Sequence, residues 1–392
     1  MTQATASADE LRAWLTLTLT PQLGPAQALM LLSELGLPQQ ILAHSLTQLS
    51  RYLGTELAHT LKKGPDEATA QLIEETLQWA QAPDQHIITI ADANYPSALY
   101  HLHTPPLLLY AKGNLELLQR PTIAIVGARN ATAAGMHNAQ EFARFLSARG
   151  WCICSGLAAG IDTAAHTGAL SAPSPHGSTI AVLATGMNIV YPAANRDLAH
   201  QIADQGLLLS EFSLHQRART FHFPMRNRIV AALSQGVLIV EAAQRSGSLI
   251  TAKLATELGR EVFAIPGSIH SPLSRGCHAL IKQGAKLVES GADILNELHT
   301  SSPSRASSPS TQGPSLPDPL PTHWQEYPLL QQMGFEPMSF DQLLQLSAAK
   351  DFNTLSVQLT ELELLGYIQR LPGGRYQQRP PSDLPSHNEP TQ

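Results

Sequence analysis

The feature that most constrains the fold is a regular alternation of short apolar runs with helix-like stretches, which begins at Thr122. Strands that are apolar along their whole length are covered on both faces, as in a parallel sheet with helices on either side. The sequence therefore predicts an α/β fold whose core is a doubly wound, Rossmann-like parallel sheet. The expected strands are Ile123–Val126, Trp151–Cys154, Thr179–Ala184, Leu207–Ser210, Val237–Val240 and Glu261–Ile265, and the expected helices lie near 134–149, 159–170, 193–205, 226–235 and 248–259.

A second constraint is residues 300–321, which contain seven Ser and six Pro in 22 positions. Such a composition buries little apolar surface and is typical of a linker. The polar, Pro-rich residues near the C-terminus predict a loose tail. We therefore divide the chain into an N-terminal helical domain (1–85), the Rossmann-like core (86–299), the linker (300–321), a small C-terminal domain (322–380) and a disordered tail (381–392).

The N-terminal domain has the pattern of a helix-hairpin-helix or SAM-like unit, with helical stretches at Leu11–Leu19 and Ala26–Leu35 around a Pro- and Gly-containing turn. Such a unit can hold a DNA backbone through amides at a helix N-terminus. The alternative is a helical accessory domain. Residues 1–119 contain 5 basic and 11 acidic residues, which makes them a poor surface for phosphate.

Four loops at the predicted carboxyl ends of strands are rich in small residues: Gly127–Thr132, Ser155–Asp162, Gly186–Asn188 and Ser246–Ser248. In open α/β sheets, ligands bind at these ends, beside helix N-termini. Small residues let backbone N–H groups approach a phosphate, and hydroxyl groups add donors. The loop residues that we expect to contact a phosphate are Gly127, Arg129, Asn130, Thr132, Ser155, Gly156, Gly160, Ser246, Gly247 and Ser248.

The same loops differ from those of familiar nucleotide enzymes. Arg129 stands where a dinucleotide-binding G-x-G-x-x-G loop needs its second glycine, and no loop ends in Gly-Lys-Ser/Thr, so neither motif is present. What remains is a fixed cation with several donors, suited to phosphate. The alternative is a structural arginine that pairs with Asp162 or with a carbonyl group.

The segment Arg217–Arg228 contains four arginines and two phenylalanines, and no acidic residue lies between Glu211 and Glu241. Guanidinium groups that contact the backbone, with rings that stack on bases, are typical of single-stranded nucleic-acid binding. In the alternative interpretation, Phe221 and Phe223 fill the core and the arginines form a solvated rim.

Asp162 and His166 are one helical turn apart, so their side chains can face each other. We expect a buried pair that fixes the loop, with an acid–base pair as the alternative. The sequence shows no nucleophile with a base at recognisable spacing and no metal-ligand cluster, so no metal and no cofactor are expected.

The composition indicates which partners and which cellular compartment to expect for this protein. The net charge of −6, taken over the whole chain, argues against a nucleic-acid binder. Residues 120–298, however, contain 15 basic and 11 acidic residues. Any DNA contact should therefore be local to the central loops. The three cysteines cannot form a disulfide framework, and we expect Cys152 and Cys154 to be buried small residues. The sequence shows neither a signal-peptide pattern nor an apolar run long enough to span a membrane. A cytoplasmic protein is expected.

In their residue sequences and in their order along the chain, these motifs resemble those of the DprA/Smf family (DNA-processing protein A, DNA recombination-mediator proteins). The resemblance extends over about residues 95–295. The segments that carry it are Ile125–Arg129, Ser155–Asp162 with Ala165-His166, Phe223–Ile229, Ser246–Ala252 and Gly259–Gly267.

The resemblance implies a non-enzymatic, dimeric recombination mediator with an extended Rossmann core that binds single-stranded DNA in a basic pocket. Such proteins protect incoming DNA in natural transformation and load RecA onto strands coated with single-strand-binding protein. It also implies that Arg129 is the family's loop arginine, and that Arg226, Asn227 and Arg228 form its Arg-Asn-Arg segment. Arg245 stands where relatives often have Lys. Ala128 departs from the more usual Ser, which removes one possible donor.

The C-terminal domain resembles the winged-helix domain that ends many DprA proteins. Leu329–Met333, Phe340–Leu346 and Thr354–Leu365 have helical patterns, and two strands follow around Pro372-Gly373-Gly374. A DNA-recognition helix should be basic, yet Thr354–Leu365 contains Glu361 and Glu363 and neither Lys nor Arg. We therefore expect a protein-contact or weak auxiliary role.

Two other functions remain open. The first is a nucleotide-processing enzyme similar to phosphoribohydrolases, which Glu241 at a strand end before a Gly/Ser loop would support. The Pro-Gly-Gly that could suggest that group lies outside the core, at 372–374. The second is a duplex-binding transcription factor, which rests on the winged helix alone.

Overall fold

The computed structural model describes residues 7–173, 178–300, 327–333, 337–347, 352–371 and 374–379. The chain divides into two compact units. The first contains the N-terminal helices and a large sheet, and the second contains a small sheet with its helices.

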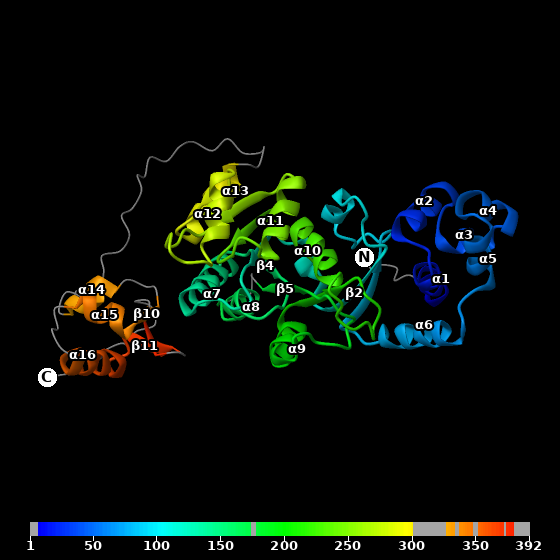
Figure 1. Ribbon diagram of the computed structural model, residues 1–392. Helices are drawn as coiled ribbons and strands as arrows, with labels where there is room; N and C mark the ends of the chain where they lie inside the picture. The colour runs from blue at the N-terminus through cyan, green and yellow to red at the C-terminus, as the bar shows by residue number, and fades with distance from the viewer. Residues whose placement is uncertain are drawn as a thin grey trace. The chain divides into compact units, whose positions relative to one another are not determined.

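The N-terminal region of the first unit is helical, as the sequence predicts (Figure 1). The first helix begins where Ser7 accepts a hydrogen bond from the Glu10 N–H, and the sixth begins where Asp66 accepts one from the Thr69 N–H. Residues of these helices share a core with Leu107, Leu108 and Tyr110, so they pack against the sheet. The helices are α1 (Ala8–Leu19), α2 (Pro25–Leu35), α3 (Pro38–Ala43), α4 (Leu46–Leu53), α5 (Thr55–Lys63) and α6 (Glu67–Trp79).

The large sheet has nine strands in the order β1-β2-β6-β5-β4-β3-β7-β8-β9. The six predicted strands are present, each within two residues of its expected bounds. The strands are β1 (Gln85–Thr89), β2 (Leu108–Gly113), β3 (Thr122–Val126), β4 (Cys152–Ser155), β5 (Thr179–Val182), β6 (Leu207–Ser210), β7 (Gly236–Ile239), β8 (Glu261–Ala264) and β9 (Lys286–Leu287).

One edge of this sheet contains two antiparallel strands that the sequence did not predict. Strand β2 pairs antiparallel with β6, and β1 pairs antiparallel with β2, whereas the remaining strands from β6 to β9 are parallel. These two strands precede the strand–helix alternation, so their pattern gave no sign that they join the same sheet. The doubly wound core itself is confirmed.

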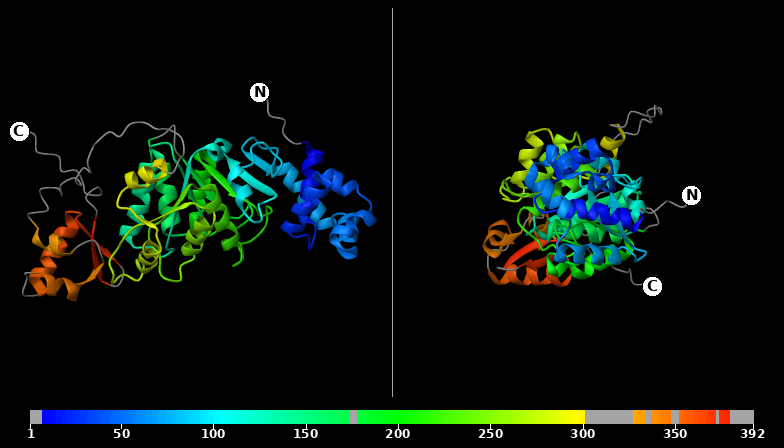
Figure 2. Two further views of the ribbon diagram at one scale, coloured as in Figure 1. Left: turned by 90° about the horizontal axis from the view of Figure 1, so that it is seen from above. Right: turned by 90° about the vertical axis from the view of Figure 1, so that its right-hand side faces the viewer.

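Helices cover both faces of the sheet, so every residue of its central strands β3 and β4 is buried (Figures 1 and 2). Residues of α10, α11 and α12 belong to one core cluster, and residues of α7, α8 and α13 belong to another. The helices of this region are α7 (Ala133–Ser147), α8 (Ile161–Leu170), α9 (Arg196–Gln205), α10 (His222–Leu233), α11 (Ser248–Glu257), α12 (Arg275–Lys282) and α13 (Gly291–Thr300).

The second unit has the three predicted helices and an additional short strand. Its sheet has the order β10-β12-β11, and Met338 and Ser339 pair with the C-terminal hairpin. Its elements are α14 (Pro328–Met333), β10 (Met338–Ser339), α15 (Phe340–Leu346), α16 (Phe352–Leu364), β11 (Ile368–Leu371) and β12 (Arg375–Gln378).

Three further expectations meet the structure. The three cysteines are free and buried. Within the described ranges, no helix has the length and hydropathy needed to cross a membrane. The boundary expected between the N-terminal helical domain and the core, at residues 85 and 86, falls at the start of β1. The limits of the domains remain predictions. The linker from residue 301 and the tail at 381–392 lie outside the described residues.

Candidate nucleic-acid interface

A cleft of about 590 Å³ opens at the carboxyl ends of the parallel strands, where the loops after β3 and β4 meet α10 and α11. This is the position at which open α/β sheets bind ligands. The residues that line it are Val126, Gly127, Arg129, Ala158, Asp162, Tyr191, Thr220, Phe223, Pro224, Arg226, Asn227, Ser246, Gly247, Ser248, Ile250 and Thr251.

The fold brings half of the predicted site residues together around this cleft, although they come from three separate segments: the loop after β3, helix α10, and the loop and first turn of α11. Those that line it are Gly127, Arg129, Phe223, Arg226, Asn227, Ser246, Gly247 and Ser248. Those outside the lining are Asn130, Thr132, Ser155, Gly156, Gly160, Phe221, Arg228 and Arg245. Asn130 and Arg245 are exposed, and each is adjacent in sequence to a residue that lines the cleft. Ser155 and Gly156 are buried.

At the mouth of the cleft, a cation lies beside an aromatic ring that contacts a second ring. Arg129 is exposed, and its Cζ lies 5.0 Å from the centre of the Phe223 ring. The Tyr191 ring is tilted against Phe223 with centroids 5.7 Å apart, and Tyr191 is half exposed. The three side chains therefore present a guanidinium and aromatic surface to the solvent. This is the combination that binds backbone phosphates and unpaired bases.

Arg226 lies in the buried floor of the cleft, with 4% of its surface exposed. Its Nη1 donates to the carbonyl oxygens of Gly156 and Val182, the latter at 2.8 Å. Burial lowers the pKa of Arg226, the nearby Asp162 raises it, and Arg129 lowers it further. The structural arginine that is held by carbonyl groups and lies near Asp162 is therefore Arg226 and not Arg129, and its Nε also donates to Asn227 Oδ1 at 3.0 Å.

Two glycines of the loop after β4 are required by this packing. A side chain at Gly156 would collide with the Arg226 guanidinium, and one at Gly160 would collide with the Ala128 carbonyl. Gly160 also has φ +78°, a conformation that favours glycine. Their contribution is therefore to hold the floor of the cleft together.

The loop before α11 presents small groups to the cleft. The Ser246 and Ser248 hydroxyls lie 2.7 Å apart, and the Ser248 N–H donates to Ser246 Oγ at 3.3 Å. Gly247 is exposed, has φ −62°, and has open space where a side chain would be. An anion can therefore approach the backbone here without obstruction.

Arg228 and Phe221 lie on the other side of α10, away from the cleft. Arg228 Nη1 donates to the Thr104 carbonyl at 2.8 Å, and Nη2 pairs with the Glu211 carboxylate. Phe221 is 55% exposed and contacts the His222 ring edge-on. The Arg-Asn-Arg segment is thus split between two sides of one helix.

The expected pair of Asp162 and His166 is wrong, although both side chains are buried. Asp162 accepts hydrogen bonds from the Gly156 and Ala158 N–H groups at 3.1 and 3.3 Å. His166 Nδ1 lies 2.7 Å from Thr179 Oγ1, and His166 Nε2 has no hydrogen-bond partner among the described residues. Asp162 instead fixes its loop through backbone amides, as a buried carboxylate can.

Glu241, on which the enzyme hypothesis depends, follows β7 but does not line the cleft. A side chain added at Gly135, in the first turns of α7, would collide with the Glu241 carboxylate. Glu241 is therefore packed against that helix.

Sequence reasoning missed several residues of the cleft, of which Tyr191 is the most exposed aromatic one. Its available signal was an aromatic residue before Pro192, just after the Gly186–Asn188 loop. Thr220 and Ile250 also line the cleft. They lie in the segments Arg217–Arg228 and Ser246–Ala252, but neither side chain is charged or aromatic, so nothing marked these two positions within their segments.

Comparisons with protein families give two matches. The model of DNA recombination-mediator protein A matches residues 86–299, the range assigned to the core, and a model of the DprA winged helix domain matches residues 313–374. Among curated proteins, the chain is 40% identical to Protein Smf of Escherichia coli over 310 residues, 77% of this chain and 80% of that protein. It is 49% identical to the DNA processing protein DprA of Streptococcus pneumoniae over 209 residues, 53% of this chain and 73% of that protein.

Two solved structures are also similar. The X-ray structure of DprA from Streptococcus pneumoniae matches with a TM-score of 0.63 and 38% identity, and the match covers 75% of this chain and 98% of that one. DNA processing protein A of Helicobacter pylori matches with a TM-score of 0.50 and 32% identity over 55% of this chain and 96% of that one. The latter structure is described as giving insight into a single-stranded-DNA binding mode of that protein.

Proposed function

Because the chain belongs to the DNA recombination-mediator protein A family, we propose that it binds single-stranded DNA in the cleft, without bond chemistry. The observation that carries this proposal is the exposed Arg129 guanidinium beside the Phe223 and Tyr191 rings, at the mouth of a cleft with Gly- and Ser-rich loops. The described binding mode of the Helicobacter pylori relative supports it.

The burial of each predicted residue suggests a role for it. Arg129 and Arg245 are exposed and would neutralise phosphates, and the backbone N–H groups near Gly127 and Gly247 would donate to a phosphate oxygen. Arg226 is buried and would hold the floor rather than contact DNA. The further candidates, which stay predictions, are Asn130, Thr132, Ser155, Gly156, Gly160, Asn227, Arg228, Ser246 and Ser248.

We further propose that the bound strand is handed on to a recombinase. The family is described as a recombination mediator, which supports a role in protecting incoming DNA and loading RecA during natural transformation. RecA, single-strand-binding protein and a second copy of the chain are the proposed partners, and the cytoplasm is the proposed compartment.

The binding proposal is tested by fluorescence anisotropy with labelled single-stranded and duplex DNA over about 50–200 mM salt. Single strands should bind more tightly, and the logarithm of affinity should fall linearly with the logarithm of salt concentration, by about 0.7 per phosphate neutralised. Equal affinity for duplex DNA, or affinity independent of salt, would contradict the proposal. The mediator role is tested by RecA filament formation on strands coated with single-strand-binding protein, with and without this protein.

The enzyme hypothesis receives no support from the packing of Glu241 against α7. Release of free base from a nucleoside monophosphate by the purified protein would revive it.

A further inference from the structure

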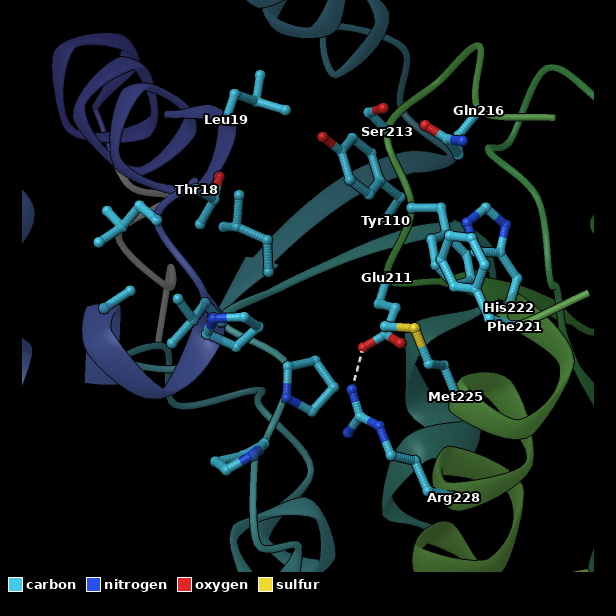
Figure 3. Close-up of a pocket in the computed structure, with 18 of the residues that line it drawn as sticks. Thr18, Leu19, Tyr110, Glu211, Ser213, Gln216, Phe221, His222, Met225 and Arg228 are labelled. Carbon is cyan, nitrogen blue, oxygen red and sulfur yellow. Dashed lines mark hydrogen bonds and ion pairs between the residues drawn. The ribbon is translucent and has the colours of Figure 1, made fainter. Parts of the chain in front are cut away.

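A second cavity, of about 340 Å³, lies between the N-terminal helices and the sheet (Figure 3). Thr18 and Leu19 of α1 and Pro25 of α2 form one wall, and Pro105 and Pro106 contribute beside them. The opposite wall comes from β2, the segment after β6 and the start of α10. Its volume is within the range of about 300–1,000 Å³ that is typical of small-ligand pockets.

The distinctive group in this cavity is the Glu211 carboxylate, whose side chain is 8% exposed. One oxygen, Oε2, pairs with Arg228, whereas Oε1 has no hydrogen-bond partner among the described residues. Figure 3 shows this carboxylate between Arg228 and the aromatic residues of the wall. A buried acceptor without a partner is unfavourable unless a ligand or water donates to it. A carboxylate also repels phosphate, so the group that faces Oε1 is an N–H or O–H donor and not a phosphate oxygen.

The walls near Glu211 are aromatic. The His222 ring stacks on Phe212 with centroids 4.1 Å apart, and Phe221 meets His222 edge-on at 4.6 Å. Tyr110 faces the cavity from β2 (Figure 3), and the exposed Arg219 also lines it. Flat aromatic walls, a single acceptor and a cation fit a planar heteroaromatic ring with an N–H edge, attached to a phosphate.

The first turns of α10 separate this cavity from the cleft. Thr220, Phe223 and Asn227 line the cleft, whereas Phe221 and His222 line the second cavity. A strand whose backbone lies in the cleft can therefore reach the cavity by crossing a single helix end.

From this geometry we infer that the cavity between the N-terminal helices and the sheet binds one unstacked base of the single strand, through an N–H group that donates to Glu211 Oε1. The inference rests on the proposed function and extends it. It assigns the N-terminal helices a role as one wall of a base-binding pocket.

The test uses the full chain and the shortest oligothymidylate that binds fully, expected at about 4–16 nucleotides. One thymine is replaced by 2-aminopurine, a fluorescent base with an amino donor, at each position in turn. We expect fluorescence quenching by ring stacking at one or two adjacent positions. At that position, purine, which lacks the amino group, should bind about tenfold more weakly than 2-aminopurine, as for a lost hydrogen bond to a charged group.

Two variants locate the effect. Phe221→Leu should remove the position-specific quenching, and Glu211→Gln should remove the preference for 2-aminopurine over purine, because its amide can still accept from Arg228 while it presents N–H₂ to the cavity. Ile269→Ala, at an exposed apolar residue that lines neither cavity, is the matched control for Phe221→Leu and should change nothing. Thermal melting checks that each variant is folded. If Glu211→Gln does not fold, Phe221→Leu still tests the pocket.

The outcomes are distinct. Tight strand binding with no position-specific signal, or a signal that Phe221→Leu leaves unchanged, would overturn the pocket and leave the proposed function intact. Equal quenching of free 2-aminopurine deoxynucleoside monophosphate would show that the occupant is a free nucleotide, and would overturn the inference. Absence of any strand binding would refute the proposed function itself.

Discussion

The Arg129 guanidinium carbon lies 5.0 Å from the centre of the Phe223 ring, so the loop after β3 and the first turn of α10 meet at the mouth of the cleft. The two residues are far apart in sequence and belong to different strand–helix units. Their contact places a cation and a stacking surface within reach of a single nucleotide. This arrangement is the basis of the first prediction.

Arg129→Ala should weaken single-stranded DNA binding and make the log–log salt slope shallower by about 0.7, because one phosphate contact is lost. Arg129→Lys should retain most of the slope. The control is Arg149→Ala, since Arg149 is also exposed and lies 3.4 Å from the centre of the Phe145 ring, but does not line the cleft. Salt titrations monitored by anisotropy provide the measurement. If Arg129→Ala and Arg149→Ala behave alike, Arg129 has no specific role.

Gly247→Ala should leave stability within about 0.5 kcal/mol of the parent, because Gly247 has φ −62° and open space at its Cβ position. If a phosphate approaches this backbone, the added methyl group should lower DNA affinity. Gly160→Ala is the contrasting variant. Its φ of +78° and the nearby Ala128 carbonyl should make it destabilising by more than about 1 kcal/mol. Urea unfolding and anisotropy separate the two effects, and unchanged affinity in folded Gly247→Ala would place the DNA elsewhere.

Arg226→Met should destabilise the protein by about 3–5 kcal/mol, because it leaves Asp162 as a buried, uncompensated charge. The double variant Arg226→Met/Asp162→Asn should recover part of this loss, since an amide oxygen can still accept from the Gly156 and Ala158 N–H groups. Urea unfolding of both single variants and of the double variant gives the coupling energy. A stable Arg226→Met protein that no longer binds DNA would show instead that Arg226 is a direct ligand.

The buried His166 should make the protein less stable as the pH falls. Thr179 Oγ1 donates to the Ile153 carbonyl, so it accepts from His166 Nδ1–H, and Nε2 is left as an unprotonated atom. Burial, with the nearby Arg226 charge, lowers the pKa of His166 from 6.5 to about 3. The unfolded chain therefore binds the additional proton between these values. The contribution of His166 to the free energy of unfolding is therefore most favourable above pH 6.5, and it decreases progressively as the pH falls towards 3.

The measurement is the free energy of unfolding against pH for the parent and His166→Gln. Below pH 6.5 the slope of the parent should exceed that of the variant, by up to about 1.4 kcal/mol per pH unit. Identical slopes would show that His166 is protonated in the folded protein.

Much of the fold was predictable because its determinants are local. Ile123–Val126 is apolar at every position and Leu207–Ser210 at all but its last, and such runs mark strands that are covered on both faces. The loops that follow them identify the edge of the sheet at which a ligand binds. The antiparallel strands β1 and β2 were missed because their membership in the sheet depends on pairing between segments that are distant in sequence.

The site was predictable as a set of loops but not as a set of roles. The sequence by itself determined that Arg129 lies in a loop at the carboxyl end of a strand, and the resemblance identified Arg226-Asn227-Arg228 as the family's Arg-Asn-Arg segment. Only the tertiary structure decided that Arg129 is exposed, that Arg226 is buried in the floor, and that Arg228 pairs with Glu211 beside a second cavity. The reason is that successive residues of a helix point about 100° apart. The surroundings of each side chain therefore depend on what packs against each side of α10, and that is set by residues distant in sequence.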